Sequence, residues 1–125
     1  QIIESEGNRQ IALLHCTSTY PTPYESISLN FLTKLKDFTN KIGYSGHEVG
    51  LPTTLAAAAI GADMIERHVT LDRAMWGSDQ AASVEPQGLR KLVQDIRDWK
   101  IIQGDGIKKV YESEIPIIEK LRRKG

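Results

Sequence analysis

The sequence predicts an α/β protein built on a parallel sheet. Three short apolar segments that suit strands, residues 11–16, 41–45 and 64–70, alternate with segments whose apolar residues recur at helical spacing. Such alternation is typical of βαβ units, in which a helix carries the chain back so that the next strand runs parallel to the last. Polar residues that suit chemistry follow each strand. Since right-handed crossovers place the carboxyl ends of the strands together, we expect these residues to share one edge of the sheet.

The first unit consists of a strand, a proline-rich loop and a helix. Residues 11–16 form a nearly continuous apolar run, the pattern of a strand buried on both faces. Pro21 and Pro23 then predict an irregular loop. Apolar residues between positions 27 and 38 recur at helical spacing and predict a helix that ends near Asn40.

The second unit has a strand and a helix of small residues. Residues 41–45 predict the strand, which a glycine-containing loop follows. Pro52 suits the first turn of the helix, and Gly61 suits its carboxyl-terminal cap. Because residues 56–59 are all alanine, this helix can lie close to the sheet.

The third unit is followed by a short terminal segment. Residues 64–70 predict a strand, and residues 71–84 a long polar loop. Pro86 begins a helix with an apolar face, Gly104 lies just beyond it, and Ser113 is expected to cap a final short helix.

Three strands cannot close a barrel, which needs about eight. We therefore expect a partial (β/α)8 TIM barrel, about the last three βα units, with its active site at the carboxyl ends of the strands. Residues 1–104 would form the barrel part and residues 105–125 a terminal helix and the start of a linker. The first residue, Gln1, is consistent with a piece of a larger protein.

The composition excludes several classes of protein. The 125 residues suit one soluble domain, 40% hydrophobic and 26% charged, with a formal net charge of zero. A balanced charge does not favour nucleic acid or an anionic membrane surface as a partner. No apolar run reaches the roughly 20 residues of a membrane span. The lone Cys16 cannot form an internal disulfide, so we expect a reducing, cytoplasmic setting.

Two histidines stand at the ends of neighbouring predicted strands. Alternation along a strand places Ser45 with His47, and Glu66 with His68, on one face. Two imidazoles with open positions beside them suit a divalent transition metal, and Glu66 could orient one of the rings. The alternative is that each histidine forms a local structural hydrogen bond.

Other polar residues favour structural roles on spacing alone. His15 lies within an apolar strand and is expected to be a hydrogen-bonded core histidine. Cys16 shares the face of Ser18, and we expect a buried, unreactive thiol. Asp72 and Asp79 lie in a loop that spacing alone describes as solvated.

Several motifs occur in a characteristic order along the whole chain. They are His15-Cys16-Thr17-Ser18-Thr19-Tyr20-Pro21-Thr22-Pro23, Gly43-Tyr44-Ser45-Gly46-His47, Glu66-Arg67-His68-Val69-Thr70-Leu71-Asp72, Gly77-Ser78-Asp79 and Ser83-Val84-Glu85-Pro86. On these motifs the chain resembles the sialic acid synthase (N-acylneuraminate synthase) family, which includes spore-coat polysaccharide and legionaminate-type members.

The resemblance implies a fold, an activity and partners. The family has a TIM barrel followed by a small antifreeze-like domain and usually forms a domain-swapped homodimer. It condenses phosphoenolpyruvate with an N-acylated hexosamine, such as N-acetylmannosamine or its 6-phosphate. The products are a nonulosonic acid and phosphate. The cofactor is a divalent metal, Mn²⁺ first, with Mg²⁺ or Co²⁺ as possible substitutes.

The resemblance also implies roles for particular residues. The metal ligands fall on His47 and His68, which with Asp79 form the catalytic set. The substrate-binding positions fall on Ser18, Tyr20, Ser45 and Asp79, with Ser45 toward phosphoenolpyruvate and Tyr20 and Asp79 toward the sugar. The family's phosphate-binding lysines belong to earlier strands.

The chain departs from the family's common pattern at two places. Members often have Asp and Thr where this chain has Gly46 and Glu48, and Pro and His where it has Ser78 and Gln80. Two alternatives to this function stay open. They are another phosphoenolpyruvate-condensing barrel, such as a 3-deoxy-octulosonate 8-phosphate synthase, and a non-catalytic half-barrel fragment.

Overall fold

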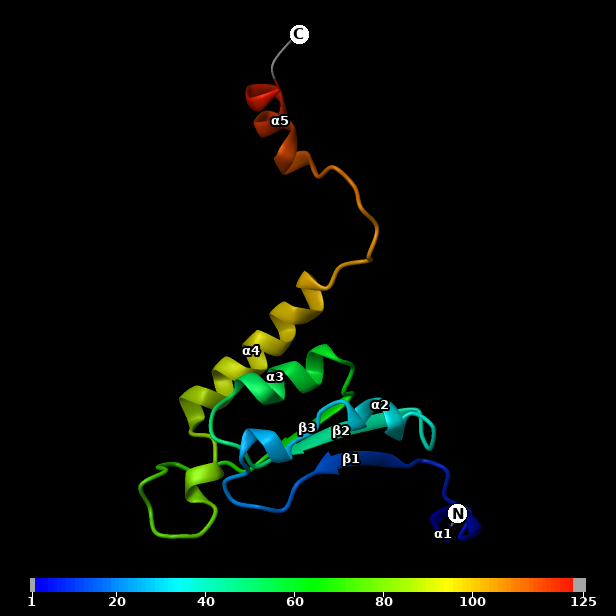
Figure 1. Ribbon diagram of the computed structural model, residues 1–125, viewed down its shortest axis with the longest axis vertical. Coiled ribbons are helices and arrows are strands. Elements are labelled where there is room, and N and C mark those ends of the chain that lie inside the picture. Colours follow the sequence, from blue (N-terminus) through cyan, green and yellow to red (C-terminus); the bar gives the residue numbers. More distant parts are fainter. Residues whose placement is uncertain (1, 123–125) are drawn as a thin grey trace.

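The computed structural model describes residues 2–122 and confirms the α/β class (Figure 1). Strands β1 (Ala12–Cys16), β2 (Lys41–Gly46) and β3 (Met64–Arg67) form one parallel sheet in the order β1-β2-β3. The α-helices are α1 (Ile2–Ser5), α2 (Phe31–Leu35), α3 (Pro52–Ala59), α4 (Pro86–Ile102) and α5 (Ile115–Leu121). None of the helices in residues 2–122 is long and apolar enough to cross a membrane.

The helices cover one face of the sheet. Figure 1 shows α3 above the sheet and α4 beyond α3, while in residues 2–122 no helix covers the opposite face of β1 and β2, since α1 lies beyond the amino end of β1. The core between the sheet and the helices is apolar and consists of Ile27, Leu32, Leu35, Ile42, Tyr44 and Ala57. On α4 the predicted apolar face is only partly covered, since Leu92 is 2% exposed and Val93 is 39% exposed. The sheet therefore has one face buried in a core and one open face.

The expected helix between Ile27 and Asn40 is shorter than its pattern indicates. The segment contains a 3₁₀ turn at Tyr24–Ser26 and then α2, which ends at Leu35. Ser28 between them has a φ of +51°, in the left-handed region that interrupts a helix. The apolar spacing is nevertheless used, because Ile27 and Leu32 are both buried.

The helix α3 ends as its sequence predicts. Gly61 has a φ of +105°, which a side chain would disfavour. Its amide N–H donates to the carbonyl of Ala58, and the amide of Ala62 donates to the carbonyl of Ala57. These two bonds form a Schellman motif and turn the chain toward β3.

Two expectations for the later elements need correction. Strand β3 ends at Arg67 instead of Thr70, and Val69 beyond it forms an isolated parallel bridge to Val84. Ser113 does not cap α5, since it lies inside the 3₁₀ turn Glu112–Glu114 that leads into the helix.

The carboxyl-terminal segment extends away from the sheet. After α4 an extended stretch leads to α5, at the far end of the long axis from the sheet (Figure 1). A helix is thus present where the terminal helix of the 105–125 segment is expected, although residues 123–125 of that segment lie outside the described part of the chain. The division at residue 104 stays a prediction.

Candidate functional site

The parallel register brings the chemistry-bearing residues into two layers on the open face. Cys16 is aligned with Ser45, and Ser45 with Glu66. Side chains two residues further along share that face, so the next layer contains His47 and His68. Ordinary strand alternation therefore sets the two histidines side by side at the carboxyl edge of the sheet.

His47 is a buried residue that its neighbours orient. Its side chain lies just beyond β2, and the residue is 4% exposed. Nδ1 donates to the carbonyl oxygen of Thr17 at 3.0 Å. The carbonyl of His47 in turn accepts the amide of Thr22 at 3.0 Å, which brings the proline-rich loop beside it. That loop places the ring of Tyr20 4.3 Å from the ring of His47, measured between centroids.

His68 faces His47 and has a carboxylate beside it. The two imidazole centroids are 5.0 Å apart in an edge-to-face arrangement. Nδ1 of His68 lies 3.5 Å from Oδ2 of Asp79. The amide of Val84 donates to the carbonyl of His68 at 2.8 Å, so the loop that carries Asp79 returns to the strand end.

These two histidines fit the divalent metal that the sequence predicts. A metal-binding imidazole commonly donates one ring N–H to a carbonyl or carboxylate oxygen, which leaves the other nitrogen for the ion. His47 and His68 both direct Nδ1 at such an oxygen, from Thr17 and Asp79. Within residues 2–122 no group of three or more His, Cys, Asp and Glu side chains forms a complete ligand set. Water or substrate would have to supply the other ligands.

The other predicted site residues lie either beside the histidines or in the preceding layer of side chains on the same face of the sheet. Tyr20 is 41% exposed, and its ring centroid lies 5.6 Å from that of His68. Ser45 donates to Oε1 of Glu66 at 2.6 Å. Glu66 therefore binds a serine, and its expected role in orienting a histidine ring stays a prediction. Ser18 is exposed at the end of the first strand.

Cys16 and His15 occupy opposite faces of β1. The expectation of a buried thiol is wrong for the described chain, because Cys16 is exposed on the open face. Its Sγ lies 3.9 Å from Nδ1 of His47 and 3.8 Å from Oγ of Ser18. His15 forms the expected hydrogen bond, from its Nε2 to the carbonyl of Ile27, but it is only half-buried and does not belong to the core cluster.

A buried ion pair behind the histidines was missed by the sequence reasoning. Arg67 Nη1 donates to Oε1 of Glu48 at 2.8 Å, with side chains 2% and 0% exposed. Tyr44 and Thr54 also donate to this carboxylate, at 2.8 and 2.9 Å. Burial, followed by the hydrogen bond to Glu48, raises the pKa of Tyr44, and burial lowers the pKa of Arg67.

Strand alternation could have predicted this pair. Glu48 continues the alternation of Tyr44 and Gly46 along β2, so it lies with the buried Tyr44 on the face that the helices cover. Arg67 shares that face with Ile65 on the neighbouring strand. Two opposite charges on one covered face indicate a buried ion pair, because a buried charge without a partner is strongly unfavourable.

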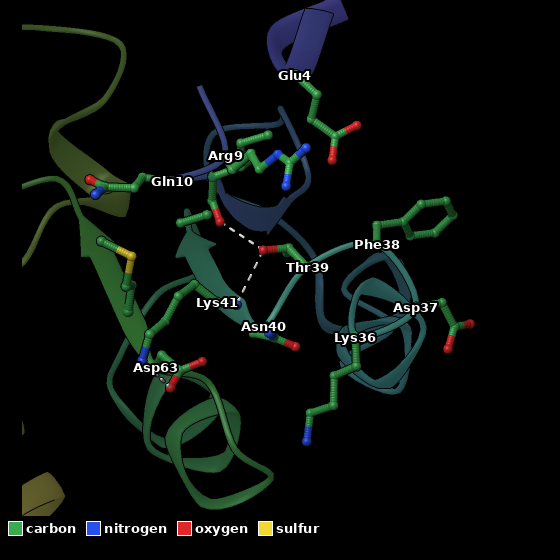
Figure 2. Close-up of a pocket in the computed structure, with 13 residues that line it drawn as sticks. Glu4, Arg9, Gln10, Lys36, Asp37, Phe38, Thr39, Asn40, Lys41 and Asp63 are labelled. Atoms are coloured by element: carbon green, nitrogen blue, oxygen red, sulfur yellow. Dashed lines mark hydrogen bonds and ion pairs between the residues drawn. The ribbon is translucent and has the colours of Figure 1, made fainter. Parts of the chain in front are cut away.

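A large hollow lies at the other edge of the sheet. It measures about 740 Å³ and is lined by residues at the amino ends of the strands, among them Lys41 and Asp63 (Figure 2). Its polar groups bind each other. Thr39 Oγ1 donates to the carbonyl of Ile11 and accepts the amide of Lys41, and Lys41 lies 3.6 Å from Asp63. The histidine pair offers metal-binding chemistry that this hollow lacks, so we place the site at the carboxyl edge.

Comparison with known proteins identifies the family to which this chain belongs. Residues 1–108 match the NeuB family. The N,N'-diacetyllegionaminic acid synthase of Campylobacter jejuni is 46% identical over 116 residues, which are 92% of this chain and 35% of that protein. This chain therefore belongs to the NeuB family, as its motifs predict.

Two solved structures resemble the chain. Spore coat polysaccharide biosynthesis protein spsE from Bacillus subtilis has a TM-score of 0.77 at 35% identity, covering 88% of this chain and 32% of that one. The N-acetylneuraminic acid (sialic acid) synthetase from Leptospira borgpetersenii has a TM-score of 0.72 at 39% identity, covering 90% and 41%. The chain spans about a third of the length of the curated relatives it matches.

Proposed function

We propose that this chain supplies part of the active centre of a carbon–carbon bond-forming synthase. The enzyme would condense phosphoenolpyruvate with an N-acylated hexosamine to give a sialic-acid-like nonulosonic acid and phosphate. Membership of the NeuB family and the printed activity of the Campylobacter relative support this class of reaction. The observation that carries it here is the convergence of two imidazoles, with centroids 5.0 Å apart, at the carboxyl edge of a parallel sheet.

The sheet would be three consecutive strands of a TIM barrel, with its open face toward the lumen. Helices cover only the outer face, as in a barrel wall. The histidines, Tyr20 and Asp79 lie at the carboxyl ends of the strands, where barrel enzymes place their sites. The complete protein would act as a homodimer in the cytoplasm, where a reducing setting suits the exposed thiol of Cys16.

His47 and His68 would hold a divalent ion, with Mn²⁺ the first choice. Such an ion, when bound, polarises a carbonyl oxygen, which suits an acceptor aldehyde that must be attacked by a carbon nucleophile. The carbonyl of Thr17 and the carboxylate of Asp79 keep the protons on the Nδ1 atoms. Both Nε2 lone pairs are therefore available as ligands.

The residues around the histidines would bind and orient the substrates. Tyr20 presents a partly exposed aromatic ring beside both imidazoles, against which a sugar can pack. The side chain of Asp79 is about half exposed, and its carboxylate can accept hydrogen bonds from sugar hydroxyl groups. Ser45 and Ser18 would contact phosphoenolpyruvate from the layer below and from the neighbouring strand. Holding both substrates in one orientation lowers the entropic part of the barrier.

Phosphate release by the complete protein that carries this sequence tests the proposal. The protein would be incubated with Mn²⁺, phosphoenolpyruvate and a panel of acceptors: N-acetylmannosamine, its 6-phosphate, a 2,4-diacetamido hexose and a pentose 5-phosphate. We expect phosphate release that depends on an N-acylated hexosamine. Release with the pentose phosphate alone would assign the octulosonate-type reaction instead, and release with none would leave a non-catalytic protein.

A further inference from the structure

One guanidinium lies behind the histidine pair and holds the segments that carry it. Arg67 Nη2 donates to the carbonyl of Glu48 at 2.7 Å and to the carbonyl of Ala82 at 3.2 Å. Its Nη1 donates to the carbonyl of Gly50 at 2.9 Å and to Thr54 Oγ1 at 2.8 Å, besides the carboxylate of Glu48. Arg67 therefore bonds to the backbone of the loops that follow both β2 and β3.

Each of these segments carries a residue of the candidate site. Glu48 directly follows His47, and Arg67 directly precedes His68. Ala82 ends the 3₁₀ turn whose first flanking residue is Asp79. Because neighbouring side chains in extended backbone point to opposite faces, the ion pair lies under the helices while both imidazoles lie on the open face.

We propose that the Arg67–Glu48 pair positions His47, His68 and Asp79 relative to one another. This inference rests on the proposed function for its consequence, but its geometry does not involve substrate. The pair reaches the imidazoles only through the backbone, so Arg67 and Glu48 are positioning residues. A planar guanidinium holds five N–H donors in a fixed fork, whereas an ammonium has three donors on a flexible stem and cannot reproduce that geometry.

Gly46 lies against the Arg67–Glu48 pair and makes room for it. A Cβ placed there would lie 2.7 Å from Oε2 of Glu48 and 3.0 Å from Cδ of Arg67. Glu48 and Tyr44, whose Cε1 would lie 2.8 Å from that Cβ, together require a glycine at this position. The Nε of Arg67 is buried and has no hydrogen-bond partner within the described residues. A carboxylate carried by residue 46 would lie beside Cδ and could take over the pairing with Arg67 through Nε.

The first test replaces Arg67 with lysine in the complete protein. Arg67→Lys keeps the charge beside Glu48 but loses the simultaneous bonds to the carbonyls of Glu48 and Ala82. We expect Mn²⁺ affinity, measured by titration followed by electron paramagnetic resonance, to fall by roughly 10- to 100-fold. Asp95→Asn is the matched control, because it removes an ion pair of the same length, 2.8 Å, from the surface of α4.

A metal-free measurement separates positioning from metal chemistry. In ¹⁵N spectra of the apoprotein, the parent should show His47 with its proton on Nδ1, as its bond to Thr17 requires. We expect Arg67→Lys to shift or broaden the ring signals of His47 and His68, and Asp95→Asn to leave them unchanged. Parent-like ring signals and parent-like Mn²⁺ affinity in a folded Arg67→Lys protein would overturn the proposal.

Relocating the carboxylate gives a rescue experiment. Glu48→Thr alone leaves Arg67 unpaired, and Gly46→Asp alone crowds the carboxylate of Glu48. The double variant Gly46→Asp/Glu48→Thr restores one carboxylate beside Arg67, and we expect its ring signals and Mn²⁺ affinity to recover to within about threefold of the parent. Recovery supports the proposal even where the single variants do not fold, and a folded double variant with displaced histidine signals contradicts it.

Failure of the two proposals is distinguishable. A parent without phosphate release in the acceptor panel contradicts the proposed function but leaves the apoprotein spectra to test the positioning. An active parent whose Arg67→Lys variant retains normal spectra and metal affinity contradicts the positioning alone.

Discussion

His47 and His68 differ in their surroundings although they occupy equivalent places on neighbouring strands. His47 is buried against the ring of Tyr20, and a main-chain carbonyl holds its Nδ1. The side chain of His68 is 36% exposed, and a carboxylate lies beside its Nδ1. The ring of His47 is thus held by rigid backbone, whereas that of His68 depends on Asp79, which can also contact a substrate.

Removal of either histidine should abolish the metal site. In the complete protein we expect His47→Ala and His68→Ala to weaken Mn²⁺ binding by more than the roughly 10- to 100-fold typical of losing a partner behind a ligand. Asp79→Asn retains an oxygen for Nδ1 of His68, so it should keep most of the metal affinity and lose sugar-dependent phosphate release. Metal content and Mn²⁺ titration measure the first effect, and the acceptor assay the second.

Two outcomes would change this assignment. Histidine variants that bind Mn²⁺ like the parent would show that the ligands lie elsewhere. Loss of metal in Asp79→Asn alone would place the carboxylate of Asp79 on the ion itself.

The buried carboxylate of Glu48 should dominate the stability of the region. Truncation in Glu48→Ala leaves the guanidinium of Arg67 buried without its counter-charge, which typically costs about 3–5 kcal/mol of unfolding free energy. The exposed pair of Lys91 and Asp95 has the same 2.8 Å contact, and Asp95→Asn should cost less than about 1 kcal/mol. Urea unfolding of the complete protein compares the two, and similar losses would be inconsistent with a special role for burial.

Among the strands and helices, the start of β2 depends on a carboxylate from the turn before β3. Asp63 Oδ2 accepts the amide of Ile42 at 3.1 Å, and Asp63 Oδ1 lies 3.6 Å from Lys41. The backbone hydrogen bond from Ile42, followed by the charge of Lys41, lowers the pKa of Asp63. The charged carboxylate therefore fastens two strands at their amino ends.

This bond predicts a pH dependence of stability. The pKa of Asp63 in the folded protein lies below its unfolded value of about 3.9. The contribution of Asp63 to the free energy of unfolding is therefore complete above the unfolded pKa and is lost as pH falls through the folded pKa. Asp63→Asn should flatten the decline of unfolding free energy with acid in that range. Asp98→Asn is the control, because Asp98 accepts a hydrogen bond from the side chain of Gln94 on the same helix, α4, and joins no strands. An unchanged slope in Asp63→Asn would contradict this account.

In the molecule as a whole, apolar and hydrogen-bonding surface remains uncovered. Within residues 2–122, strands β1 and β3 each have one unpaired edge, since β2 lies between them. The open face exposes Met64, and the carboxyl-terminal segment exposes Ile102, Val110 and Leu121 at 73%, 63% and 73%. Unpaired strand edges and exposed apolar groups favour association.

The 125-residue chain prepared alone should self-associate or bind a separately prepared remainder of the barrel. We expect analytical ultracentrifugation to show oligomers, because the open sheet face and strand edges need partners. We also expect negligible synthase activity from this chain, since three strands cannot close the barrel that the proposed site requires. A well-folded monomer, or phosphoenolpyruvate-dependent turnover free of contaminating enzyme, would contradict these expectations.

Local pattern was sufficient for the three strands, for α3 and α4, and for the meeting of His47 with His68. Strand alternation and parallel register follow from spacing along the chain, and so does the edge at which the histidines converge. The early helix was overestimated because the positive φ of Ser28 is not visible in apolar periodicity.

The partners of the site residues were decided by tertiary structure. Glu66 accepts a hydrogen bond from Ser45, and Cys16 is exposed beside His47 rather than buried. Arg67 meets Glu48 across 19 positions of sequence. Such contacts depend on how two strands and their loops approach through the core, and local spacing specifies a face of the sheet but not which side chains on that face come within bonding distance.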